Sequence, residues 1–109
     1  MTGATRTEVL VTVTRFVDPD QPGWLECALT DAAGRAHLFI EKVPVVTEED
    51  LDESSSYPRS ATLACEVLDR RTLADGSERV TIDTARPWGI ASIEGVSRFV
   101  VAAELVVVG

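Results

Sequence analysis

Carboxylate side chains gather in one short segment of this chain, residues 47–53. The segment carries five acids and no basic residue: Glu48, Glu49, Asp50, Asp52 and Glu53. Such a cluster suits either coordination of a hard cation or long-range attraction of a basic surface. The simplest interpretation is a solvated loop, and the functional one is recognition of a basic partner. We therefore take the five acids as the first candidate binding residues.

A calcium-binding loop is the specific metal site that this spacing begins to match. Asp50, Asp52 and Ser54 start the required alternation of oxygen ligands. The position that needs glycine holds Ser55, however, and the twelfth residue is Ala61 instead of glutamate. The match therefore fails, and we predict no metal at this segment.

Catalytic and zinc chemistry lack their usual residue sets. His37 is the only histidine, and no Gly-x-Ser-x-Gly motif is present to supply an activated serine. Cys27 and Cys65 are isolated in strand-like runs, without the spacing of zinc ligands. We expect both to be small buried thiols, with a cross-strand disulfide as the alternative. We predict no catalytic residue, no metal and no cofactor.

Residues 86–89 form the second candidate site. Pro87 and Gly89 restrict the backbone around Trp88, and Arg86 precedes them. A rigid, exposed aromatic side chain beside an arginine is typical of binding hot spots. The alternative is that Trp88 plugs one end of the domain, and Trp24, which also follows a Pro-Gly pair, is its counterpart.

The charge balance narrows the classes of partner. The formal net charge of −8 disfavours nucleic acid and anionic membranes, because both repel such a surface. No run of residues reaches membrane-spanning length, and the first seven residues lack the apolar core of a signal peptide. We expect a cytoplasmic protein whose partner, if it has one, is basic.

Short strand-like runs make up the rest of the chain and must position these candidates. Valine-rich alternation predicts strands, because branched side chains pack well on a pleated surface. A compact turn at residues 31–34 predicts a hairpin, and Thr47 followed by acids resembles a helix start. The predicted strands are residues 8–17, 24–30, 36–43, 61–70, 78–85, 90–94 and 97–108.

The last run, residues 97–108, is apolar on both faces. Phe99 and Val101 lie on one face, and Val100 and Ala102 lie on the other. Such a strand is expected to be buried on both sides, either centrally in the domain or at a subunit interface. This pattern is the basis for expecting a homodimer.

These patterns predict an all-β fold. We expect a small antiparallel β-barrel or sandwich of six to seven strands, with one long acidic connection and at most a short helix. A barrel is favoured because closure removes exposed strand edges. Residues 1–7 are expected to be a flexible N-terminus and residues 8–109 a single β domain.

The leading functional hypothesis is a non-enzymatic binding module. It would recognise a basic protein, as an inhibitor or immunity protein does, through the acidic segment and the 86–89 turn. The first alternative is a small-molecule-binding barrel or enzyme with a pocket at its mouth, lined by His37, Glu41, Arg86 and Trp88. The second alternative is a structural subunit of a homo-oligomer.

Overall fold

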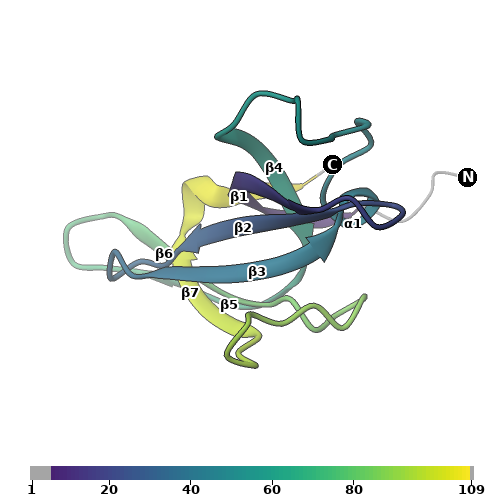
Figure 1. The fold of residues 1–109 in the computed structure, drawn as a ribbon. Helices are drawn as coiled ribbons and strands as arrows, with labels where there is room; N and C mark the ends of the chain where they lie inside the picture. Colours follow the sequence, from purple (N-terminus) through teal and green to yellow (C-terminus); the bar gives the residue numbers. More distant parts are fainter. Residues whose placement is uncertain (1–5, 109) are drawn as a thin grey trace, which may run out of the picture.

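Eight strands and two short helical turns form the fold in the computed structural model, which describes residues 6–108 (Figure 1). This architecture confirms the predicted all-β class, with one strand more than the expected six to seven. The elements are β1 (Thr7–Asp18), β2 (Trp24–Thr30), β3 (Ala36–Lys42), α1 (Val43–Val46), β4 (Arg59–Ala64), β5 (Glu66–Thr72), β6 (Glu78–Asp83), β7 (Arg98–Ala102), η1 (Ala103–Leu105) and β8 (Val106–Val108).

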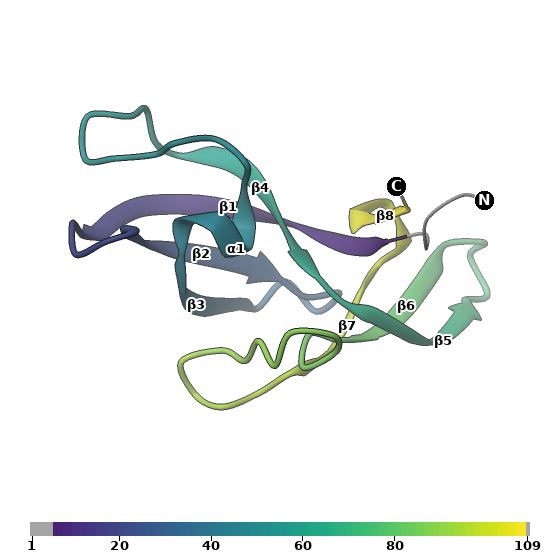
Figure 2. The ribbon, with the colours of Figure 1, turned by 90° about the vertical axis from the view of Figure 1, so that its right-hand side faces the viewer.

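The strands pair into two antiparallel sheets. The first has the order β3-β2-β1-β4, with β8 added beside β1, and the second has the order β5-β6-β7 (Figures 1 and 2). Single backbone hydrogen bonds connect the sheets, from Cys65 N to Thr7 O (3.0 Å) and from Ala32 N to Val100 O (2.8 Å). Within the described residues the strand pairing does not show a closed barrel.

The core lies between the two sheets and is filled by the alternating apolar residues. In β1 the inward face is formed by Val9, Val11 and Val13, which are all buried. Successive strand residues point to opposite faces, so each strand contributes every second side chain. Both sheets contribute other large core side chains: Leu25, Leu29, Phe39, Leu63, Val80, Ile82, Phe99 and Val101.

Three predicted strands differ from the structure, and two of them lie before residue 97. The run at 61–70 is divided at Cys65, which passes the chain from the first sheet to the second. The run at 90–94 is a loop, because Ser92 forms a tight turn with Gly95 and Val96. Backbone hydrogen bonds from Gly95 N to Ser92 O and from Ser92 N to Val96 O, both 2.8 Å, close that turn.

The prediction that residues 97–108 are buried on both faces is wrong for the single chain. The run is divided by η1 into β7 and β8. Phe99 and Val101 are buried, whereas Val100 is 46% exposed and Val107 is also exposed. Because each sheet is covered on its inner face only, the outward valines have no layer above them.

The helical turn lies before the acidic residues. The predicted helix start at Thr47 is wrong, because α1 is complete at Val46 and Thr47 is extended (φ −157°, ψ 155°). Pro44 occupies the first turn of α1, where its fixed φ suits a helix. The Thr47 hydroxyl accepts a hydrogen bond from Glu49 N (3.1 Å) and so organises a local turn instead. In residues 6–108 no helix is long and apolar enough to span a membrane.

The predicted hairpin at residues 31–34 is confirmed. Asp31 Oδ1 accepts hydrogen bonds from Ala33 N (2.9 Å) and Arg35 N (3.0 Å). Gly34 has φ +85°, a conformation that L side chains rarely adopt. The turn therefore sets the register of β2 against β3, in which Trp24 pairs with Lys42.

Most of the predicted flexible N-terminus, residues 1–7, lies outside the described residues. Thr7 is described and already belongs to β1, where it pairs with Val108.

Candidate functional site

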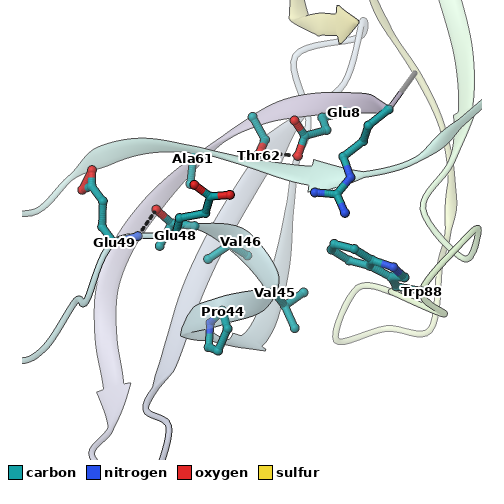
Figure 3. A pocket seen from close by; sticks show the side chains of 11 residues that line it. Glu8, Pro44, Val45, Val46, Glu48, Glu49, Ala61, Thr62 and Trp88 are labelled. Carbon is teal, nitrogen blue, oxygen red and sulfur yellow. Dashed lines mark hydrogen bonds between the residues drawn. The ribbon is translucent and has the colours of Figure 1, made fainter. Parts of the chain in front are cut away.

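A cavity of about 360 Å³ lies between α1, the start of the acidic connection, β4 and the turn after β6 (Figure 3). We call this cavity the acidic groove. It brings together Glu48, Glu49 and Trp88, which the sequence suggested as parts of two separate sites. The groove is lined by Arg6, Glu8, Pro44, Val45, Val46, Thr47, Glu48, Glu49, Ala61, Thr62 and Trp88.

Two apolar anchors hold the acidic side of the groove. On one side α1 buries Val43 and Val46, and on the other side Leu51 is only 8% exposed. The residues between these anchors lie at the surface, so Glu48 and Glu49 are exposed. Figures 1 and 2 show the connection after α1 projecting from the two sheets.

A hydrogen-bonded turn holds Trp88 on the other side of the groove. Thr84 is fully buried; its Oγ1 donates to Ile90 O (2.8 Å), and its carbonyl accepts from Ile90 N (3.1 Å). A further bond runs from Gly89 N to Ala85 O (2.7 Å). The turn leaves Trp88 45% exposed at the groove, so it does not act as the buried plug considered above.

Glu8 on β1 contributes a carboxylate to the groove, and Arg6, which immediately precedes β1, contributes a guanidinium. The Arg6 guanidinium lies 4.5 Å from the centroid of the Trp88 ring, within the range of a cation–π contact. Glu8 Oε2 accepts a hydrogen bond from Thr62 Oγ1 (2.9 Å) on β4 (Figure 3). Three carboxylates and one guanidinium thus line the groove.

The three carboxylates differ in their partners. Glu49 forms an ion pair with Arg59, and Glu8 is held by Thr62. Glu48 makes no hydrogen bond or salt bridge through its side chain within the described residues. In Figure 3 the Glu49 carboxylate points away from Trp88. Glu8 and Glu48 are therefore the carboxylates with the most capacity to meet a cation in the groove.

The remaining acids of the connection lie outside the groove. Asp50 lines a neighbouring cavity of about 390 Å³. Asp52 organises the loop itself, since its carboxylate accepts hydrogen bonds from Ser54 N (2.8 Å) and Ser54 Oγ (2.7 Å). These hydrogen bonds lower the pKa of Asp52. Glu53 is exposed beside this turn.

The residues suggested for a barrel-mouth pocket do not share one cavity. Arg86 lines a cavity of about 610 Å³ together with Arg6, while Trp88 lines the acidic groove. His37 lines a third cavity, of about 420 Å³. Glu41 lies on the same face of β3 as His37, at the other end of the strand, and burial raises the pKa of its carboxyl.

Arg6 and Glu8 are the charged residues of the groove that the sequence did not indicate. Arg6 immediately precedes β1 and Glu8 is its second residue; both line the same cavity, as expected for residues two positions apart in an extended chain. Nothing in the alternation of β1 marks them as facing a turn that comes after β6. Their role is visible only once the two segments are placed in space.

No family model, curated protein or solved structure matches this chain.

Proposed function

We propose that this chain is a non-enzymatic binding module that recognises a basic protein partner through the acidic groove. The observation that supports it most is the convergence of Glu48, Glu49 and Trp88 on one cavity. Masking of a basic toxin or nuclease, as by an inhibitor or immunity protein, is the concrete form of this proposal. We also propose a cytoplasmic location, since Cys27 and Cys65 are free thiols, as in reducing compartments.

The charge of the protein and the composition of the groove act at different ranges. A net charge of −8 attracts a basic protein over several ångströms and speeds encounter, an effect that salt screens. At contact, an exposed tryptophan supplies a large apolar surface, and neighbouring carboxylates supply acceptors for charged donors. Trp88 with Glu8 and Glu48 provides this combination.

The test is capture of partners from the native host by the tagged chain at low salt, followed by binding of the purified candidate. Trp88→Ala and the double variant E48Q/E49Q are expected to weaken binding at least tenfold, the range of a hot-spot residue. The matched control D69N/E104Q removes two exposed carboxylates that do not line the groove. It is expected to change affinity far less and mainly through the rate of association.

Salt dependence supplies the second readout. The wild-type complex is expected to weaken steadily as salt is raised, because the encounter is electrostatic. If D69N/E104Q weakens binding as much as E48Q/E49Q does, net charge alone is responsible and the groove is not the site. If no basic protein binds at low salt, the proposal is wrong.

The outward face of β7 favours a homodimer as a second proposal. Val100 is 46% exposed on this strand, and Val107 on β8 is also exposed. Removal of residues 99–109 would not test this proposal, because Phe99 and Val101 belong to the core of the single chain. Val100→Asp is the better test: a dimer built on this face should become a monomer in analytical ultracentrifugation, and an unchanged dimer would contradict it.

A further inference from the structure

In the acidic groove, the guanidinium of Arg6 lies against the ring of Trp88. Arg6 and Trp88 are far apart in the sequence, and strand pairing does not bring them together. The other cation–π pair, Lys42 with Trp24 at 5.5 Å, is a cross-strand neighbour in the β2–β3 register. The Arg6–Trp88 contact is therefore not a result of strand pairing. It forms because both residues line the acidic groove.

From this contact we infer that the acidic groove recognises an arginine side chain of its basic partner, and that Arg6 occupies the arginine position in the free protein. The inference rests on the proposed function and specifies the chemistry of the partner. On binding, the incoming guanidinium replaces that of Arg6 on the ring of Trp88. Arg6 acts as an internal competitor and the partner displaces it.

The lining of the groove favours a guanidinium over an ammonium. A guanidinium is planar, stacks on an aromatic face, and still presents several N–H donors at its edge to carboxylates. Trp88 supplies the face, and Glu8 and Glu48 supply carboxylates in the same cavity. A lysine ammonium is more strongly hydrated and cannot use the ring and two carboxylates in this planar arrangement.

The position of Arg6 allows it to be displaced. It immediately precedes β1, its side chain is exposed, and within the described residues it makes no salt bridge. An exposed cation–π contact is weak, so its removal is expected to strengthen arginine binding by about two- to fivefold. The competitor thus lowers the affinity of any ligand that stacks on Trp88 modestly and by the same factor.

The experiment measures binding of Nα-acetyl-arginine methylamide to the full chain by NMR, with the amide signals of residues 45–49 as the readout. Arg6→Ala is expected to bind this probe about two- to fivefold more tightly than the wild type. The matched control is Arg71→Ala, which removes an exposed arginine of β5 and makes the net charge equally more negative. The lysine counterpart of the probe is expected to bind more weakly to every variant.

Three results would overturn the inference. R6A binding no more tightly than R71A would show that Arg6 does not compete, and weaker binding by R6A would make it part of the binding surface. Equal binding of the two probes would remove the preference for guanidinium. In each case the proposed function stands if E48Q/E49Q and W88A still weaken the protein partner. If those variants leave the partner's affinity unchanged, the proposed function itself fails, whatever the probe does.

Discussion

The Nε2 atom of His37 lies 2.8 Å from Oδ2 of Asp31, across the β2–β3 hairpin. The other Asp31 oxygen accepts the amides of Ala33 and Arg35, so one carboxylate holds both the turn and the histidine. The His37 side chain is only 10% exposed, and its ring lies 4.8 Å from that of Phe99 on β7. Through His37, Asp31 therefore connects the β2–β3 hairpin to β7 in the second sheet.

Replacement of Asp31 by alanine is expected to lower the free energy of unfolding by about 1–3 kcal/mol at pH 7, because two amides and a buried histidine lose their acceptor. The hydrogen bond from His37, with the backbone amides, lowers the pKa of Asp31. A lowered pKa in the folded state gives stability that is present above about pH 4 and is lost as the carboxylate becomes protonated. The difference between wild type and D31A should therefore shrink below pH 4 in urea unfolding.

The control for this prediction is Asp75→Ala. Asp75 accepts Ser77 N (2.9 Å) and Ser77 Oγ (2.6 Å) in the β5–β6 turn, but no histidine is bonded to it. Its loss should cost less than that of Asp31. Equal losses would show that turn hydrogen bonds alone explain the effect.

Glu41→Gln is expected to stabilise the protein at pH 7. Burial raises the pKa of Glu41, with partial compensation by Lys42. A raised pKa means that ionisation costs stability as pH rises through it, so a neutral side chain at this position is favoured at pH 7. The thermal midpoint of E41Q should exceed that of the wild type at pH 7 and match it near pH 3.

Glu26→Gln on the adjacent strand should show the opposite sign. Hydrogen bonds from Thr14 and Arg15 lower the pKa of Glu26, so its charged form is favoured in the folded protein. The loss at pH 7 is expected to be at most about 1 kcal/mol, as for a surface ion pair. A gain in stability for both variants would indicate that net charge, and not local burial, controls these positions.

Leu51→Ala is expected to destabilise the protein by about 2–3 kcal/mol, near the lower end for buried leucine. Leu51 is 8% exposed and is the apolar anchor beyond the acidic side of the groove. Leu68→Ala on β5 is the matched control, because Leu68 is 40% exposed and should cost less than about 0.5 kcal/mol. Equal effects in urea unfolding would mean that the acidic connection is not anchored by Leu51.

Both thiols are expected to be unreactive in the folded protein. Burial is the main cause that raises the pKa of Cys27 to about 12 and that of Cys65 to about 11. Since the thiolate is the reactive form, a disulfide reagent at pH 8 should modify neither thiol until the protein unfolds, and then both. Rapid modification of one thiol under native conditions would contradict the burial of that cysteine.

The strands were predictable because their signal is local. Alternation such as Val9, Val11 and Val13 needs only the two-residue period of an extended chain and one buried face. The turn at Asp31 was predictable for the same reason, since its hydrogen bonds stay within a few residues. One error occurred where a distant contact decides, at Cys65, whose amide bonds to Thr7 and which divides one predicted strand between two sheets. The errors at residues 90–94 and at Thr47 arose differently, because strand and helix patterns there compete with local turns.

By itself, the sequence determined the all-β class, the acidic segment, and Trp88 as a second candidate binding residue. Composition and short-range periodicity carry that information. Only the tertiary structure decided that Glu48 and Trp88 line the same cavity, together with Glu8 and Arg6. It also decided that the Asp52 carboxylate accepts hydrogen bonds within its own loop. The reason is physical. Which side chains face each other depends on how β1, β4 and the turn after β6 pack, and no local pattern in the chain encodes that distance.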